Sequence, residues 1–206
     1  MTFKRIMISG PHSIGKTTTA KLLAEELGYT NVHSVAAQVA GNYGYDIDKC
    51  EPNDIIRHQE RILEAFQYVY EATKEAKVVH DRSPLDFYAY TVMQLRNSKG
   101  KHNDFIGTYR EQCIKTINEN CDLLVIPVVD WNEPYEHKDG RPVWTKEQAK
   151  YREEYHKIVK SVASMTSESI REIFVPIEHQ YKDRVWYIIN TIEALTEKKL
   201  NLSKLS

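Results

Sequence analysis

The chain has 206 residues, of which 41% are hydrophobic and 28% are charged, and its formal net charge is -1 at pH 7. This length suffices for one well-buried domain and is short for two, and the balanced charge excludes the overall basic field of many nucleic-acid-binding domains, though not a local basic patch. The sequence contains no uninterrupted apolar run of about 18 residues, which a membrane span requires. We therefore expect one globular domain over residues 1–206, with no membrane anchor and no targeting segment.

The cysteines predict the redox environment of the protein. Cys50, Cys113 and Cys121 are odd in number and have neither a CxxC nor a Cys/His metal-binding spacing. This pattern argues against a disulfide framework and against a zinc site. It favours a reducing compartment, so we expect a cytoplasmic protein. The sequence leaves the oligomeric state open, a homodimer included.

Short apolar runs alternate along the chain with longer segments of helical periodicity, which is typical of α/β proteins. The runs that we predict as strands are residues 5–9, 31–36, 77–80, 123–129 and 172–177. The segments that we predict as helices are residues 16–27, ended by Gly28, then 53–75, capped by Asn53, and 84–96, 103–120, 146–164 and 182–198. This pattern predicts one five-stranded parallel sheet flanked by helices.

The first predicted strand runs into the sequence GPHSIGKT, residues 10–17, which matches the phosphate-binding pattern GxxxxGK[ST]. The glycines let the backbone turn successive N–H groups inward at the start of a helix, which forms a nest for anions. The residues that we expect to bind the phosphates are Gly10, Ser13, Ile14, Gly15, Lys16, Thr17 and Thr18. Lys16 would reach the β and γ phosphates of ATP, and Thr17 would coordinate Mg²⁺. We interpret His12 as a spacer. The alternative to a phosphate-binding loop is a simple glycine-containing turn, which the strand-loop-helix context disfavours.

A second motif, KVVHDRSPLDFYAY, occupies residues 77–90. A short apolar strand ends there at Asp81, where a carboxylate could hold Mg²⁺ and its water or accept a proton from a substrate hydroxyl. Arg82 follows at once, and Ser83-Pro84 is typical of a helix start. The alternative to a functional role is that Asp81 and Arg82 form a surface ion pair beside a helix start. The presence of the first motif disfavours this alternative.

The combination of GPHSIGKTT with DRSPLDFYAY resembles the nucleoside and nucleotide kinase branch of P-loop proteins. The overall likeness is to small kinases similar to the ribosylnicotinamide kinase domain of NadR-like proteins, a group that includes kinases encoded by bacteriophages. The resemblance implies a P-loop fold with a lid segment. It also implies that Asp81 lies near the acceptor and the metal, and that Arg82 contacts the acceptor or its phosphate.

The resemblance also implies a lid at about residues 131–152, within a long polar stretch that contains HKDGRPVWTKEQAKYREEY. Lids of such kinases supply arginines that stabilise charge on the transferring phosphoryl group, and we select Arg141 and Arg152. A solvated hairpin leading into a charged helix is the alternative. Asp130 is a second, lower-ranked candidate for the metal carboxylate. By family analogy, the last helix, with Asp183, Arg184 and Trp186, lies where the adenine ring is expected.

The acceptor pocket is the least defined part of the predicted site. The segment 53–75 contains charged and aromatic candidates for a pocket, although helical spacing places some of its rings more simply in the core. These candidates are Arg57, Arg61, Phe66, Tyr68 and Tyr70. The helix after Asp81 contains Phe87, Tyr88 and Tyr90, of which we expect one or two to face a ligand.

These observations predict a single-domain kinase that transfers the γ-phosphoryl group of ATP, with Mg²⁺, to a nucleoside or nucleoside monophosphate. One alternative is a kinase that acts on a hydroxymethylated base in phage DNA, and a second is a regulatory P-loop NTPase. The charged segments mix basic with acidic residues, which favours a free nucleoside or nucleotide over polymeric DNA. A GTPase is disfavoured because the sequence contains no NKxD-type guanine motif.

Overall fold

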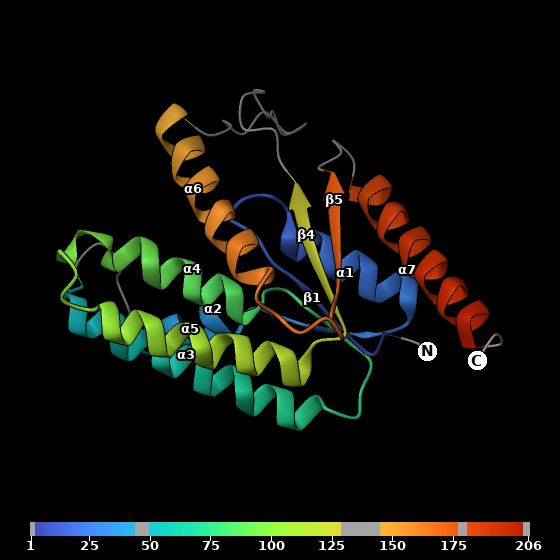
Figure 1. Ribbon diagram of the computed structural model, residues 1–206, viewed down its shortest axis with the longest axis horizontal. Helices are drawn as coiled ribbons and strands as arrows, with labels where there is room; N and C mark the ends of the chain where they lie inside the picture. The colour runs from blue at the N-terminus through green and yellow to red at the C-terminus, as the bar shows by residue number, and fades with distance from the viewer. Residues whose placement is uncertain (1–2, 44–49, 129–144, 177–180, 204–206) are drawn as a thin grey trace.

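The computed structural model describes residues 3–43, 50–128, 145–176 and 181–203. Within these ranges a five-stranded sheet lies between two groups of helices (Figure 1). Every pair of neighbouring strands is parallel. The α/β class and the five-stranded parallel sheet predicted from the sequence are therefore confirmed.

The sheet has the strand order β2-β3-β1-β4-β5. The strands are β1 (Arg5–Ile8), β2 (Thr30–Val32), β3 (Val78–His80), β4 (Leu123–Val128) and β5 (Arg171–Pro176). Strand β1 is central, because its Met7 pairs with His80 of β3 on one side and with Leu124 of β4 on the other. Since the strands are parallel, the segments that follow β1 and β3 leave the sheet at the same edge.

The helices agree with the predicted segments to within a few residues, with one exception that is described below. They are α1 (Lys16–Leu27), α2 (Val35–Tyr43), α3 (Pro52–Thr73), α4 (Pro84–Leu95), the short 3-10 helix η2 (Arg96–Ser98), α5 (Asn103–Asn120), α6 (Lys146–Ala163) and α7 (Tyr181–Ser203). Helix α3 begins at Pro52 rather than after Asn53, so the predicted cap at Asn53 is wrong.

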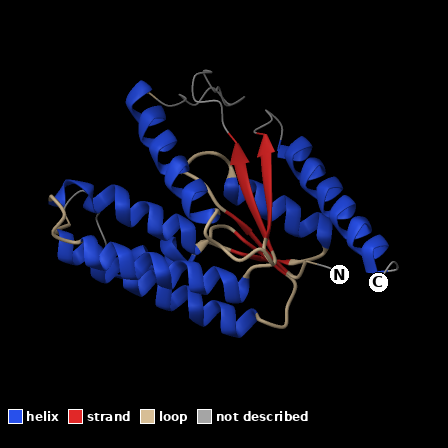
Figure 2. Cartoon of the chain, in the orientation of Figure 1, coloured by secondary structure: helices blue, strands red, loops and turns tan. Residues whose placement is uncertain are grey.

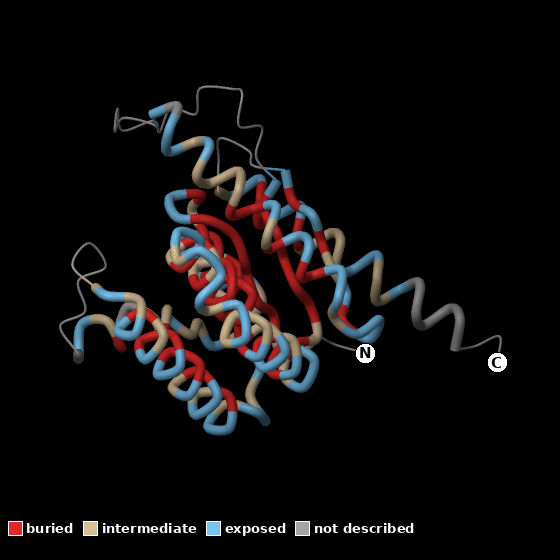
Figure 3. Tube along the Cα trace, turned by 60° about the vertical axis from the view of Figure 1, so that its left-hand side comes forward, coloured by how far each residue is buried: buried red, intermediate tan, exposed pale blue. Residues whose placement is uncertain are grey.

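The two faces of the sheet carry separate cores. Helices lie on both sides of the strands (Figure 2). Because side chains alternate along a strand, Ile6 and Ile8 of β1 share a core with residues of α1 and α7, whereas Met7 shares one with residues of α3 to α6. All three side chains are fully buried. Figure 3 shows buried strands in the interior and exposed outer sides on the helices. This two-sided burial explains why β1, β3 and β4 read as nearly continuous apolar runs in the sequence.

Helix α2 corrects the sequence prediction. The segment 31–36 was expected to be a strand, but β2 ends at Val32 and a helix begins at Val35. Strand β2 pairs only with the three residues of β3, as Thr30–Val32 against Val78–His80, so the sheet gives no partner to the residues that follow. Those residues fold as a helix over α3 instead, and Val35 and Val39 become part of the core.

All three cysteines are free, with Cys113 and Cys121 buried. None of the helices in the described ranges is both long enough and apolar enough to cross a membrane.

Candidate active site

The loop between β1 and α1 has the backbone conformation expected for phosphate binding. Gly10, Ser13 and Gly15 have positive φ angles of 147°, 63° and 81°. Glycine adopts such angles at little cost, and a Cβ at Gly15 would also collide with the ring of Tyr181 at the start of α7. The loop ends at the N-terminus of α1, where the free backbone N–H groups and the helix dipole attract anions.

Lys16 follows this loop, is buried, and bonds back to it. Its side chain is only 5% exposed, and its Nζ donates a 2.6 Å hydrogen bond to the carbonyl oxygen of Pro11. Burial, followed by the positive charge of Arg82, lowers the pKa of Lys16 to about 7. The lysine is therefore held at the loop by a neutral partner, which an anionic ligand could replace.

Thr17 and Asp81 join the two motifs of the sequence. The Thr17 hydroxyl donates a 2.6 Å hydrogen bond to Oδ2 of Asp81, which follows directly after β3. The other carboxylate oxygen, Oδ1, is buried and has no hydrogen-bond partner among the described residues. Burial raises the pKa of Asp81, although the hydrogen bond from Thr17 opposes the shift. Asp81 is thus a carboxylate with unused capacity to accept a proton or a hydrogen bond.

A cavity of about 290 Å³ lies over the loop, and we term it the donor cavity. It is lined by His12, Ser13, Gly15, Lys16, Thr17, Thr18, Arg82 and Tyr181. Gly10 and Ile14 were also expected to bind phosphate, but they do not line it. The backbone N–H of Gly10 donates to Asp86, and the side chain of Ile14 is buried. Asp81 is not among the lining residues, but it is hydrogen-bonded to Thr17, which is.

Arg82 is held in place by contacts from three parts of the chain. Its backbone has a φ of 141°, which is unusual for a residue with a side chain. The guanidinium donates to the Ser34 hydroxyl at 3.0 Å and contacts Nδ1 of His12 at 3.1 Å. It also lies over the ring of Tyr90, 5.6 Å from the ring centroid. Such a defined position for a cation is typical of a functional site.

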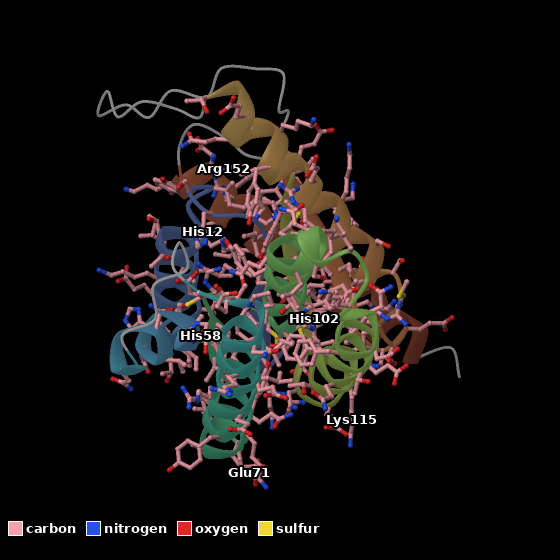
Figure 4. All side chains as sticks on the ribbon, turned by 90° about the vertical axis from the view of Figure 1, so that its left-hand side faces the viewer. His12, His58, Glu71, His102, Lys115 and Arg152 are labelled. Atoms are coloured by element: carbon pink, nitrogen blue, oxygen red, sulfur yellow. The ribbon has the colours of Figure 1, made fainter. Side chains whose placement is uncertain are left out.

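Arg152 approaches the same loop from α6. Its Nε donates a 3.1 Å hydrogen bond to the carbonyl oxygen of His12. Figure 4 shows the labelled Arg152, His12 and His58, which come from α6, the loop and α3, along one side of the molecule. Of the two arginines predicted for the lid, Arg152 is thus brought to the loop. Arg141 lies outside the described residues, as does the alternative carboxylate Asp130.

A second cavity of about 300 Å³ adjoins the first, and we term it the acceptor cavity. It is lined by His12, Ser34, Ala36, Ala40, His58, Gln59, Ile62, Arg82, Phe87, Tyr90 and Gln94. His12 and Arg82 line both cavities, so the two spaces meet at these side chains. Gln59 donates to Gln94 at 3.3 Å, while its own Oε1 is buried without a partner among the described residues.

Other aromatic and basic candidates divide between the core and the cavities. Tyr90 and Phe87 line the acceptor cavity, although Phe87 is also a core residue, whereas Tyr88 packs in the core alone. Phe66 and Tyr70 are also core residues. The other three candidates of α3 do not line the described cavities: Tyr68 is 79% exposed, and Arg57 and Arg61 are exposed as well.

The last helix, α7, makes hydrogen bonds to the phosphate-binding loop. Arg184 of α7 is fully buried and donates to the carbonyl oxygen of Ile14 at 2.7 Å and to the Thr19 hydroxyl at 3.1 Å. Trp186, in contrast, is 67% exposed. Arg184 therefore contacts the loop itself, and the position of the last helix near an adenine ring stays a prediction.

Two residues of the site were missed by sequence reasoning. His12 was interpreted as a spacer, yet its ring packs on Tyr90 at 4.8 Å between centroids and faces both cavities. Desolvation and the positive charges of Arg82 and Lys16 lower the pKa of His12 to about 3, although the residue remains exposed to the cavities. The sequence holds no local signal for this role, because Arg82 is 70 residues away.

Asp86 is the second missed residue, and it is fully buried. Its carboxylate accepts hydrogen bonds from the backbone N–H of Gly10 at 2.8 Å and from the Ser9 hydroxyl at 3.1 Å. It also accepts from the backbone N–H of Ser83 and from the Tyr155 hydroxyl, both at 2.8 Å. The pattern Ser83-x-x-Asp86 forms a capping box at the start of α4, so this part of the network was visible in the sequence.

Comparison with known proteins identifies the fold. Deoxyadenosine kinase from M. mycoides with bound dATP superimposes with a TM-score of 0.65 at 16% identity, covering 92% of this chain and 99% of that chain. Thymidylate kinase from Candida albicans gives 0.64 at 11% identity, covering 95% and 93%. The NadR protein in complex with NAD and AMP-PNP gives 0.63 at 17% identity, covering 93% of this chain but 49% of that chain. The resemblance inferred from the two motifs is thus confirmed for the fold.

A family model described as "AAA domain" matches residues 5–174. Among curated proteins, none matches the sequence significantly. The family match spans both motifs, from β1 into β5, and includes the donor and acceptor cavities except Tyr181. The chain therefore belongs to this AAA domain family, and it has the P-loop fold that solved nucleoside and nucleotide kinases share.

Proposed function

We propose that the protein transfers the γ-phosphoryl group of ATP to a nucleoside or nucleoside monophosphate. The observation that carries this proposal is the meeting of two cavities at His12 and Arg82. One cavity contains the phosphate-binding loop, and the other has aromatic and amide walls. A volume of about 300 Å³ lies at the lower end of the range for small-molecule sites. An NTPase that uses water as its acceptor would need no second cavity of this kind.

In the donor cavity, the backbone of the loop and the side chains of Lys16 and Thr18 would hold the phosphates of ATP. The oxygens of Thr17 and Asp81 lie 2.6 Å apart and are of the type that Mg²⁺ prefers, so these residues fit the ion. No group of three or more His, Cys, Asp or Glu that could hold a metal occurs in the described ranges, so phosphates and water would complete the coordination. When bound, Mg²⁺ neutralises charge on the β and γ phosphates.

In the reaction, the acceptor oxygen forms a bond to the γ-phosphorus while the bond from that phosphorus to the β,γ-bridging oxygen breaks, and ADP leaves. Asp81 accepts the proton of the acceptor hydroxyl, a role that its raised pKa suits. Arg82 and Arg152 stabilise charge on the group in transfer, because both lie beside the loop. We assign the same role to Arg141.

In the acceptor cavity, the rings of Phe87 and Tyr90 suit a flat base. The buried Oε1 of Gln59 lacks a partner among the described residues, and an N–H group of a base would satisfy it. The Gln59→Leu variant should therefore raise the KM for the acceptor by about tenfold while leaving the KM for ATP unchanged. Gln67→Leu is a matched control, because Gln67 lies on the same helix but bonds to Thr116.

The experiment that tests the proposal uses ATP labelled on the γ-phosphate. The protein is incubated with free nucleosides and with nucleoside monophosphates, and in parallel with DNA that contains hydroxymethylated bases, at low and moderate salt. We expect label on a free nucleoside or nucleotide. Label on DNA alone, with strong salt dependence, would overturn the proposal and support a DNA kinase.

A further inference from the structure

The contacts between α6 and the phosphate-binding loop carry an inference that rests on the proposed function. Two side chains of α6, Arg152 and Tyr155, are three residues apart and so share one side of the helix. Arg152 donates to the carbonyl oxygen of His12 in the loop. Tyr155 is fully buried, and its hydroxyl donates to Oδ1 of Asp86 at 2.8 Å. The helix is therefore attached to the site at two adjacent points.

Asp86 connects the second of these points with the loop. The same oxygen, Oδ1, accepts the hydrogen bond of Tyr155 and that of the backbone N–H of Gly10, the first residue of the loop. Its other oxygen accepts from the end of β1 through Ser9 and from the start of α4 through Ser83. A single buried carboxylate thus joins the loop, α4 and α6.

We propose that Asp86 and Tyr155 are positioning residues, which fix helix α6 against the phosphate-binding loop and thereby place the guanidinium of Arg152 over the phosphates. Asp86, Tyr155 and Arg152 do not line the donor or the acceptor cavity, but Arg152 reaches the loop from α6 by its hydrogen bond to His12, so we infer that Asp86 and Tyr155 act through Arg152 and the loop. A displacement of about 1 Å at a group that acts on a transition state can cost about a hundredfold in rate. Loss of the buried Tyr155 hydroxyl, which bonds to Oδ1 and to the carbonyl oxygen of Asp86, should therefore slow the reaction.

The charge of Asp86 supports this arrangement. Burial lowers the pKa of Lys16, and among the groups that oppose this shift Asp86 is the strongest. The same carboxylate that fastens the helix therefore also favours the charged form of the lysine in the loop. The role of Asp86 in the capping box would explain its contact with Ser83, but not its contacts with Gly10 and Tyr155.

The test is a double-mutant cycle of Tyr155→Phe and Arg152→Ala, with kcat, KM for ATP and Tm measured for each protein. Tyr155→Phe should lower kcat about tenfold and leave the KM for ATP nearly unchanged. In the Arg152→Ala background, Tyr155→Phe should cause almost no further loss, because the residue through which it acts is already gone. Asp86→Asn, if it folds, should behave as Tyr155→Phe does.

Tyr70→Phe is the control for the loss of a buried tyrosine hydroxyl. Tyr70 is also buried, and its hydroxyl bonds to Sδ of Met7 at 3.0 Å, whereas that of Tyr155 bonds to both Oδ1 and the carbonyl oxygen of Asp86. Tyr70→Phe should lower Tm, with kcat unchanged. The inference is overturned if Tyr155→Phe lowers only Tm, or if the losses of the two substitutions multiply. A normal kcat for Arg152→Ala would also overturn it, yet the proposed function would stand as long as transfer to the acceptor persists.

Discussion

The hydroxyl of Thr17 lies 2.6 Å from the carboxylate of Asp81, although the two residues are 64 positions apart in the sequence. Thr17 lies in the first turn of α1, after the phosphate-binding loop, and Asp81 follows β3. The parallel pairing of β1 with β3 brings these two points to the same edge of the sheet. The two motifs recognised in the sequence therefore form one site.

The Asp81→Asn substitution tests the role of this carboxylate. Asparagine keeps the shape and can still accept the hydrogen bond of Thr17, but it cannot take up a proton at neutral pH. We expect ATP binding to persist and kcat to fall by about 10² to 10⁴, as for the loss of a general base. Asp54→Asn, at an exposed position of α3, should leave kcat unchanged. Weaker ATP binding with a normal kcat would remove Asp81 from the chemical step.

Lys16 should make ATP binding depend on pH. With a pKa of about 7, most of this lysine is neutral in the free protein at about pH 8. Phosphate oxygens favour the charged form, so binding should draw in up to about one proton per ATP, and affinity should fall as the pH rises above about 7. Calorimetry at about pH 8, in two buffers with different ionisation enthalpies, measures this uptake.

The Lys16→Arg variant is the control for that measurement, because arginine remains charged throughout this pH range. It should bind ATP without taking up a proton at this position. Equal proton uptake by the two proteins would show that Lys16 does not meet the phosphates.

The activity should depend on where residue 12 places its hydrogen-bond acceptor. Arginine can only donate, so Nδ1 of the neutral ring accepts from Arg82 and Nε2 carries the hydrogen. His12→Asn keeps an acceptor near the position of Nδ1, whereas His12→Gln moves it outward. We expect His12→Asn to retain several times more kcat/KM for the acceptor than His12→Gln, on the order of a single hydrogen bond to a charged group. Equal values in steady-state kinetics would contradict a role through Arg82.

The sequence predicted most of the fold because its signals are local. Strands β1, β3 and β4 are nearly continuous apolar runs, and α1 is followed by a glycine. The pattern GxxxxGK[ST] between a strand and a helix defines the loop within a few residues. Of the predicted strand 31–36, the first two residues do belong to β2, and the rest was assigned wrongly. Its valines suit a strand, but β2 pairs with only three residues of β3, after which the chain leaves the sheet.

The acceptor side of the site could not be predicted in the same way. Its cavity combines residues from the loop, α2, α3 and α4, and no spacing in the sequence links Ala36 with Gln94 or His12 with Arg82. Asp86 makes one contact that follows from a local sequence pattern and one that does not. Its capping box is a local pattern, but its contact with Tyr155, 69 positions away, exists only in the folded chain.

The most direct test of the account is the rate of ADP formation from ATP with and without acceptor, measured together with the phosphorylated product. We predict that a nucleoside or nucleoside monophosphate strongly stimulates ADP formation, that each ADP is matched by one phosphorylated acceptor, and that Lys16→Met abolishes both. ADP formation at the same rate without acceptor, with phosphate as the only other product, would contradict the account and identify an NTPase.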